Sequence, residues 1–352
     1  MRIGLGPVAR RLLFASLGIA PLTIVVRFAT DADDVTLFVL SAISLIPLAW
    51  LIGEATEHAA RQTGPGIGGF LNATFGNAPE LIIALFAIDD GLFGVVRGSL
   101  TGSVVGNLLL VLGFSLFLGP ATRIDRRSEL ISIGLVLVAV LLFLVVAVPG
   151  WNGNVSEHTL QVLSIPVSIV LLVIYVLVTW GQLRRHHALH EDAAPDLTAW
   201  PLHLTLGVLA AATAVTAVVA EILVGSIEAF AEKAHLSDFF VAAVIVAIVG
   251  NAAEHGGAVV VARRGRVKLA SEIALSSSAQ VAVFLIPAVA ILSWTIQPLA
   301  LSFRKVEIAA MGGAAILTAL LLVQGRTTRW RGAVLVAAYV VVAVAFYKAG
   351  SA

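Results

Sequence analysis

Two stretches decide how this chain folds: residues 72–88, which read NATFGNAPELIIALFAI, and residues 246–262, which read VAIVGNAAEHGGAVVVA. Each contains a Gly-Asn pair and, three residues after the asparagine, a glutamate within an apolar run. An ionised carboxylate at the centre of a bilayer costs at least about 2.5–3.5 kcal/mol, and neither Glu80 nor Glu254 has a Lys or Arg within one helical turn. The paired occurrence favours a cation or proton site over protonated glutamates buried in helix contacts.

The composition outside these stretches is that of a membrane protein. The chain has 352 residues, of which 59% are hydrophobic and 12% charged, where soluble globular chains have about 25% charged residues. A soluble domain of this size has too little interior for so much apolar surface, so a soluble enzyme and a disordered chain are excluded. The chain contains no cysteine, which excludes disulfides, thiolate catalysis and zinc-thiolate sites.

Apolar stretches long enough to cross a bilayer as helices recur along the whole chain. They lack the period-two alternation of a β-barrel, so we expect an all-α polytopic membrane protein with eleven transmembrane helices. The predicted spans are residues 12–29, 35–60, 66–88, 95–119, 129–149, 159–181, 203–230, 237–262, 269–294, 306–324 and 332–348.

The distribution of Lys and Arg predicts the orientation. Most of them lie in alternate loops, such as residues 123–127 and 263–268, which should be cytoplasmic. We therefore expect a multi-pass protein of the cell membrane, a prokaryotic inner membrane, with its N-terminus in the cytoplasm and its C-terminus outside. No basic run resembles a nucleic-acid-binding tail, so we expect lipid and no nucleic acid as surroundings. The sequence leaves open whether copies associate as a homo-oligomer.

The chain repeats itself after a shift of 174 residues. The shift superimposes Glu54 on Glu228, Gly76-Asn77 on Gly250-Asn251, Glu80 on Glu254, and Ser103 on Ser277. We expect an extra N-terminal helix (residues 1–33), a first five-helix repeat (34–183), a cytoplasmic linker (184–201) and a second five-helix repeat (202–352). Because five is odd, the second repeat is inverted, which is typical of secondary transporters that bind substrate near the midplane.

The residues around each glutamate predict a broken helix. Gly tolerates unusual backbone angles and Pro79 removes one helix hydrogen bond. A break frees carbonyl groups to bind a cation. Asn77 and Asn251 share a helix face with Glu80 and Glu254, and we expect all four to be cation- and proton-binding residues. The following spans supply polar side chains that we expect to line the site: Ser103, Asn107, Ser277 and Gln280. The alternative is that these groups only join helices.

Other ionisable groups suggest an access or proton path. Inverted symmetry places Glu54 toward the inner mouth and Glu228 toward the outer mouth, and His255 follows Glu254 directly. We expect these three residues to relay protons or attract cations. The alternative is interfacial snorkelling, which is the stronger interpretation for Glu57 and Glu221, or a structural histidine.

Residues 76–113 (GNAPELIIALFAIDDGLFGVVRGSLTGSVVGNLLLVLG) and 250–287 (GNAAEHGGAVVVARRGRVKLASEIALSSSAQVAVFLIP) resemble the two α-repeats of the calcium/proton exchanger (CAX) family, within the calcium/cation antiporter superfamily. The resemblance implies that Glu80 and Glu254 are metal ligands and proton acceptors. It places Asn77 and Asn251 beside them, with Ser103, Asn107, Ser277 and Gln280 on the following helices. Ser276 departs from the family, which commonly has Gly there, and the linker has too few acidic residues for a regulatory helix.

The predicted function is therefore exchange of calcium for protons by alternating access, with both ions as transported substrates and no cofactor. A sodium or potassium/proton antiporter on the same fold is the alternative, because the sequence does not count ligands. A cation channel is a further class, but a pair of broken helices suits alternating access better. We do not expect an enzyme, since no HExxH or comparable catalytic grouping occurs.

Overall fold

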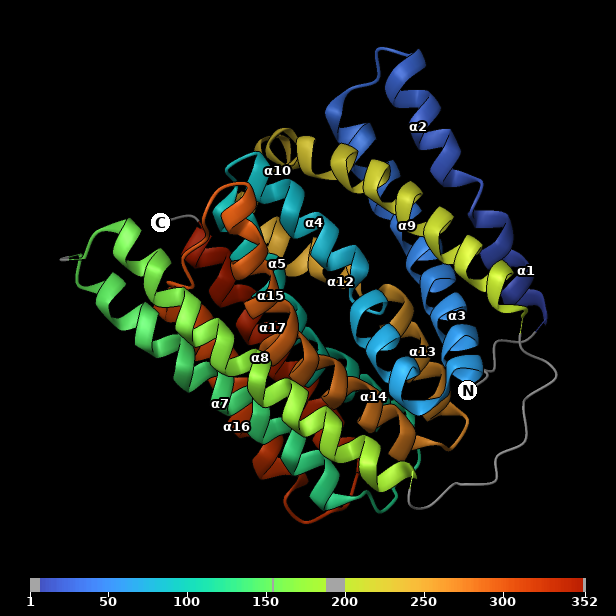
Figure 1. Cartoon of the computed structure of the whole chain (residues 1–352), viewed down its shortest axis with the longest axis vertical. Helices are drawn as coiled ribbons and strands as arrows, with labels where there is room; N and C mark the ends of the chain where they lie inside the picture. Colours follow the sequence, from blue (N-terminus) through green and yellow to red (C-terminus); the bar gives the residue numbers. More distant parts are fainter. Residues whose placement is uncertain (1–6, 154, 188–199, 351–352) are drawn as a thin grey trace.

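A computed structural model describes residues 7–153, 155–187 and 200–350, and almost all of these residues are helical. The helices of the first part are α1 (Pro7–Ser16), α2 (Ile19–Ala29), α3 (Asp34–Phe75), α4 (Ala78–Asp89), α5 (Phe93–Val105), the π-helical η1 (Gly106–Val111), α6 (Leu112–Leu118), α7 (Arg126–Trp151) and α8 (Glu157–His187). They form a bundle in which helices from distant parts of the sequence lie side by side (Figure 1).

The second part follows the same pattern of long helices and short interruptions. It contains α9 (Leu202–Gly225), α10 (Ile227–Ala234), α11 (Asp238–Phe240), η2 (Val241–Val246), α12 (Ala247–Gly250), α13 (Ala252–Arg263), α14 (Val267–Gln280), η3 (Val281–Leu285), α15 (Ile286–Leu292), η4 (Ser293–Thr295), α16 (Lys305–Leu322) and α17 (Arg329–Gly350). Both η2 and η3 are π-helical, and η4 is a 3₁₀ turn.

The helix lengths confirm an all-helical membrane fold. Among the described residues, nine helices are long and apolar enough to cross a bilayer, or ten if α10 and the bent segment Asp238–Gly250 form one span. These two pieces meet at 108°. The predicted span 203–230 is divided into α9, which ends at Gly225, and the short helix α10, which begins at Ile227. The nine correspond to nine of the predicted spans, and the total of eleven stays a prediction.

The two remaining predicted spans, 66–88 and 237–262, are both interrupted at a Gly-Asn pair. In the first, α3 ends at Phe75 and α4 begins at Ala78, with Asn77 at φ −104° and ψ 17°. In the second, α12 ends at Gly250 and α13 begins at Ala252, with Asn251 at φ −93° and ψ 7°. The predicted helix breaks are thus confirmed, and each asparagine is the N-cap residue of a helix whose third residue is a glutamate.

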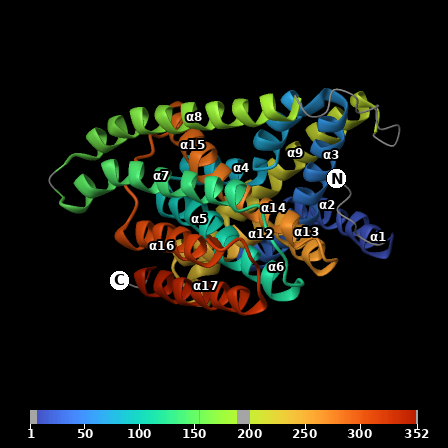
Figure 2. The ribbon, with the colours of Figure 1, turned by 90° about the horizontal axis from the view of Figure 1, so that it is seen from below.

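The interrupted helices lie inside the bundle. α3 packs along α9, α2 lies against α3, α7 packs on α16 and α6 on α17 (Figures 1 and 2). The continuous segment α5–η1–α6 is largely buried, whereas α2 and α17 expose most of their apolar side chains, as expected at a lipid boundary. The breaks are therefore held between helices that shield them from lipid.

Glycine allows the closest approach between the two halves. A Cβ atom on Gly102 of α5 would lie 2.0 Å from the carbonyl oxygen of Ala243 in η2, and one on Gly98 would lie 3.0 Å from the carbonyl oxygen of Phe239. Only a residue without a side chain permits this contact. This contact places α5, which carries Ser103 and is followed by Asn107, directly against η2, which is followed by α12 and Asn251.

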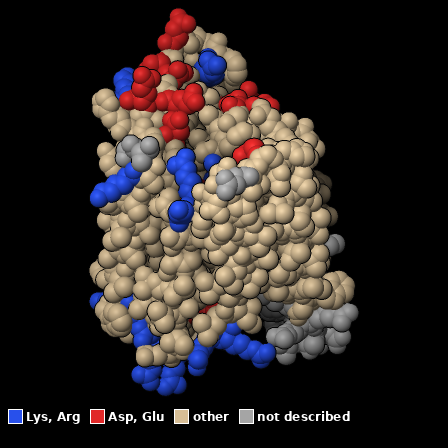
Figure 3. Space-filling model, turned by 90° about the vertical axis from the view of Figure 1, so that its left-hand side faces the viewer, with Lys and Arg blue, Asp and Glu red and all other residues tan. Residues whose placement is uncertain are grey.

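Charged side chains gather at opposite ends of the bundle (Figure 3). The end where α2 meets α3 and α10 carries Asp33, Asp34 and Glu232, and we call it the acidic end. We call the basic end the one where α13 meets α14, which carries Arg263, Arg264, Arg266 and Lys268. An apolar band separates the two ends, as in a protein that spans a bilayer. Most of the predicted linker, residues 188–199, lies outside the described residues, and its first residues, 184–187, extend α8.

Candidate cation-binding site

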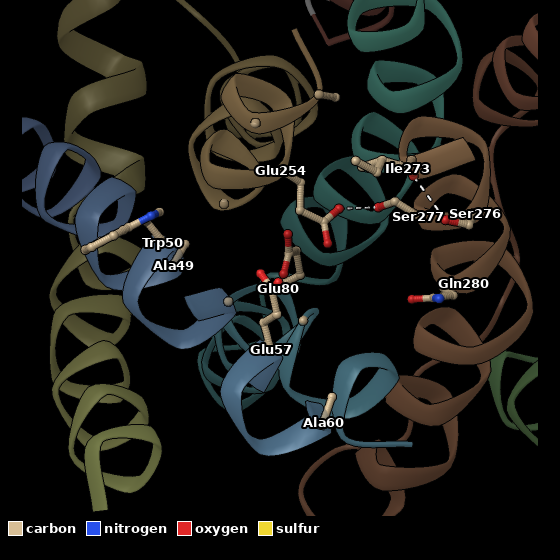
Figure 4. Close-up of a pocket in the computed structure, with 15 residues that line it drawn as sticks. Ala49, Trp50, Glu57, Ala60, Glu80, Glu254, Ile273, Ser276, Ser277 and Gln280 are labelled. Carbon is tan, nitrogen blue, oxygen red and sulfur yellow. Dashed lines mark hydrogen bonds between the residues drawn. The ribbon is translucent and has the colours of Figure 1, made fainter. Parts of the chain in front are cut away.

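A cavity of about 310 Å³ lies between α3, α4, α13 and α14. Its walls combine three carboxylates, two serines and one amide with small and apolar residues (Figure 4). The lining residues are Ala49, Trp50, Gly53, Glu57, Ala60, Gly76, Glu80, Gly250, Glu254, Gly257, Ala258, Ile273, Ser276, Ser277 and Gln280. Both glycines of the Gly-Asn pairs are among them, so the cavity adjoins both helix breaks.

Glu80 and Glu254 enter this cavity from opposite walls. Their carboxylates point toward one another across it (Figure 4). Glu80 is 7% exposed and packs against the other break, since a Cβ atom on Gly250 would lie 3.6 Å from its Cγ and its Oε1. The two glutamates thus converge on one cavity, as predicted. Two negative charges that face each other favour a cation or protons between them.

The asparagines of the two breaks donate hydrogen bonds that join the two halves of the chain. Asn251 donates from Nδ2 to Ser103 Oγ (2.9 Å) and to the Ala247 carbonyl (3.1 Å). Asn77 donates from Nδ2 to Gln280 Oε1 (3.5 Å). Each asparagine therefore reaches a polar residue on a helix of the other half, and the two contacts tie the halves together at the level of the cavity.

A second chain of hydrogen bonds ends on one of the glutamates. Asn107 of η1 donates from Nδ2 to Ser277 Oγ (3.1 Å), and Ser277 donates from Oγ to Glu254 Oε2 (2.6 Å). Both Asn107 and Ser277 are buried. Because a serine hydroxyl has one proton, the bond from Asn107 orients that proton toward the carboxylate. Ser277 and Gln280 line the cavity. Asn107 contacts it through Ser277, whereas Ser103 bonds to Asn251, and neither of these two is among the lining residues.

Two buried oxygens of the site have no hydrogen-bond partner among the described residues. They are Glu80 Oε2 and Asn107 Oδ1. Burying an unsatisfied polar group is costly, so these atoms suit a ligand that supplies positive charge. No three His, Asp or Glu side chains of the described part of the chain converge on one point. A bound cation would therefore take further ligands from the Gln280 amide, the serine hydroxyls, free carbonyls or water.

The residues predicted for an access path lie farther out. Glu54 faces His58, with 3.8 Å between Oε1 and Nε2, and His58 also accepts a hydrogen bond from the Trp200 backbone. Glu228 is exposed on α10 at the acidic end. His255 lies on α13, and its Nε2 is buried without a partner among the described residues. Their role in proton or cation transfer stays a prediction.

Sequence reasoning underestimated Glu57, which it interpreted as an interfacial side chain. Glu57 lines the cavity and forms an ion pair with Arg61 (Nη2 to Oε1, 2.5 Å). A signal was present, since Ala49, Gly53 and Glu57 recur every four residues and so place small residues and a carboxylate on one helix face. Ser276 also lines the cavity, and its hydroxyl donates to the Ile273 carbonyl (3.2 Å).

Comparison with known proteins places this geometry in context. The family model described as sodium/calcium exchanger protein matches residues 34–184 and 204–348. The chain is 35% identical over 340 residues to a Ca²⁺/H⁺ antiporter of Aphanothece halophytica, covering 90% of this chain and 91% of the relative. It is 38% identical over 330 residues to the Ca²⁺/H⁺ antiporter ChaA of Bacillus subtilis, covering 88% of this chain and 92% of that protein.

The fold also matches a solved structure. The structure of native YfkE superimposes with a TM-score of 0.82 and 34% sequence identity, covering 95% of this chain and 99% of that chain. The two stretches matched by the family model together contain both helix breaks and all four walls of the cavity. The resemblance found in residues 76–113 and 250–287 therefore extends over nearly the whole chain.

Proposed function

The chain belongs to the sodium/calcium exchanger protein family, and on that premise we propose that it is a calcium/proton antiporter of the membrane, a transporter rather than an enzyme. The observation that carries the proposal is the pair of glutamates, Glu80 and Glu254, that line one cavity and face each other at two broken helices. The identity of 35–38% to Ca²⁺/H⁺ antiporters over most of the chain supports calcium and protons as the exchanged ions.

Exchange is possible because calcium and protons bind the same carboxylate oxygens. Calcium prefers six to eight oxygen ligands, among them carboxylates, carbonyls and water. We assign Glu80 and Glu254 as cation ligands and proton acceptors, with Asn77 and Asn251 holding the helix breaks in place. Because calcium needs both carboxylates ionised and protons neutralise the same oxygens, either calcium or protons occupy the site. An empty site with two buried charges resists crossing the membrane, which limits leak.

The position of the cavity indicates which access state the structure represents. Its α3 wall, from Ala49 to Ala60, belongs to the part of α3 that runs toward Thr63, away from the acidic end where α3 begins. Its α14 wall lies on the helix that begins at the basic end. The cavity thus extends from the glutamate pair toward the basic end, and we assign the structure to the state that exchanges ions with that side.

The membrane orientation and the repeats belong to the same proposal. We place the basic end in the cytoplasm, with the N-terminus inside and the C-terminus outside, as the Lys and Arg distribution predicts. Nine continuous spans plus the two interrupted spans give eleven, arranged as one extra helix and two inverted five-helix repeats. The recurrence of an asparagine N-cap followed by a glutamate at both helix breaks supports the repeats. In this orientation the favoured direction is calcium export driven by proton entry.

The test is ion uptake into everted vesicles that carry an imposed proton gradient, acid inside. We expect calcium uptake in the wild type that collapses when the gradient is dissipated, and its loss in Glu80→Gln and in Glu254→Gln. Glu157→Gln, an equal change at an exposed residue where α8 begins, serves as the control and should transport normally. Calcium uptake that survives in both site variants would disprove the site assignment. Uptake of sodium or potassium but not calcium would select a monovalent cation/proton antiporter instead.

A further inference from the structure

Glu57 is a third carboxylate in the cavity, and the exchange chemistry of Glu80 and Glu254 does not use it. It lies on the α3 wall and lines the same cavity as Glu80 (Figure 4). Along α3 it lies on the side of the cavity nearer the basic end, two residues beyond Ala55 and three before Ala60. A cation that approaches from that end therefore passes Glu57 before it reaches the glutamate pair.

The carboxylate of Glu57 already forms an ion pair in this structure. The guanidinium of Arg61, one helical turn further toward the basic end, donates from Nη2 to Glu57 Oε1 at 2.5 Å. The Arg61 side chain is 20% exposed and the Glu57 side chain 23%, so the pair keeps partial contact with water. An arginine is permanently charged and has only donors, so it cannot coordinate a metal ion. Its positive charge beside the carboxylate opposes a cation that binds there.

We propose that Glu57 is the first ligand for the transported cation on the basic side, and that Arg61 is a tethered counter-ion that competes for it. This inference rests on the proposed antiport function. In this structure the guanidinium neutralises one of the three carboxylates that line the cavity. When a cation arrives, Arg61 moves to the solvent at the open end, and when the cation leaves, the ion pair re-forms and prevents immediate rebinding.

The competition between Arg61 and the cation should affect cation binding from one side of the membrane only. Arg61 and Glu57 lie on the basic side of the glutamate pair, so they affect binding only while the cavity is open to that side. Removing the guanidinium should strengthen cation binding from the basic side and leave binding from the acidic side unchanged. A residue that merely stabilised the fold would weaken transport from both sides.

The experiment measures half-saturation for calcium separately on each side, in everted and in right-side-out vesicles. Arg61→Gln should lower the half-saturation concentration on the basic side about fivefold, and Arg61→Met should do the same. Arg61→Lys, which keeps a cation, should stay near the wild type. Glu57→Gln should raise the value about fivefold, and in that background Arg61→Gln should have no effect. Arg264→Gln, an exposed residue of the same end, is the matched control.

Several results would overturn the proposal. They are an unchanged or raised half-saturation in both Arg61→Gln and Arg61→Met, an equal change on both sides, or an Arg61→Gln effect that persists without the Glu57 carboxylate. The outcome is separable from the proposed function. If the wild type exchanges sodium and not calcium for protons, the calcium assignment fails. The role of Arg61 is then tested with the same variants by measuring half-saturation for sodium.

Discussion

The hydroxyl of Ser277 donates a hydrogen bond of 2.6 Å to a carboxylate oxygen of Glu254, joining α14 to α13 beside the cavity. The same hydroxyl accepts a bond from Asn107, so the donor is itself held in orientation by the η1 segment of the first half. A ligand supported in this way binds a cation without first having to reorganise. Ser277 is therefore a positioning residue for one of the two central glutamates.

Replacing Ser277 by alanine should weaken cation binding without unfolding the protein. The change removes the donor to Glu254 and leaves Asn107 without an acceptor, and loss of such a supporting contact typically costs about 10–100-fold in metal affinity. We expect at least a tenfold rise in half-saturation for calcium in vesicles. Ser278→Ala is the control, because the neighbouring Ser278 hydroxyl donates to the Val104 carbonyl (3.1 Å) instead. Equal effects of the two changes would contradict this role.

Replacing Gly102 by alanine should destabilise the whole bundle. The added Cβ would lie 2.0 Å from the Ala243 carbonyl oxygen and 2.7 Å from the Ala247 side chain, so α5 and η2 would have to separate. We expect a loss of about 3–5 kcal/mol in unfolding free energy, measured by denaturation in detergent. Gly94→Ala on the same helix, where nothing lies within 4 Å of the added atom, should be neutral or slightly stabilising. A Gly102 variant as stable as the Gly94 variant would show that the close approach is unimportant.

Replacing Ser271 by alanine should destabilise the contact between α7 and α14. Ser271 donates to Glu129 Oε1 at 2.5 Å, and both residues are at most 1% exposed. Without this donor the buried carboxyl group loses its hydrogen bond, which costs about 1–3 kcal/mol. Thermal unfolding in detergent measures the loss. Ser132→Ala on exposed α7 surface, whose hydroxyl bonds only within its own helix (3.4 Å), should leave the melting temperature unchanged.

The loop between α2 and α3 should contribute a small, pH-dependent stabilisation. The Thr36 hydroxyl donates to Asp33, and together with Lys233 (Nζ to Oδ2, 3.4 Å) it holds the pKa of Asp33 below its ordinary value of 3.8. A lowered pKa in the folded state means that the stabilisation is present above pH 3.8 and disappears as the pH falls through the lowered pKa.

Asp33→Asn should therefore melt slightly below the wild type at pH 6, and the difference should shrink as the pH falls below 3.8. The effect is small because the pair is exposed to solvent. Asp31→Asn in the same loop is the comparison. A difference between Asp33→Asn and the wild type that grew as the pH fell would have the wrong sign for this contact.

The sequence predicted the helix breaks well because their cause is local. Gly76-Asn77 and Gly250-Asn251 interrupt helices through backbone preferences that operate within one turn. It favoured Glu54 over Glu57, three residues away on α3, whereas Glu57 is the one that lines the cavity. The rotation of α3 about its own axis decides which of them faces the cavity. That rotation is set by packing on α9, where Ile52 and Ala55 contact Leu209 and Ala212.

The sequence by itself determined that the chain spans a membrane, that two glutamates stand at broken helices within it, and that the second lies 174 residues after the first. Composition, periodicity and local backbone preference are enough for these conclusions. Only the tertiary structure decided that Asn251 pairs with Ser103, that Ser277 supports Glu254, and that Glu57 with Arg61 lies beside the cavity. Periodicity shows which residues share a helix face, but packing between distant helices decides which faces meet.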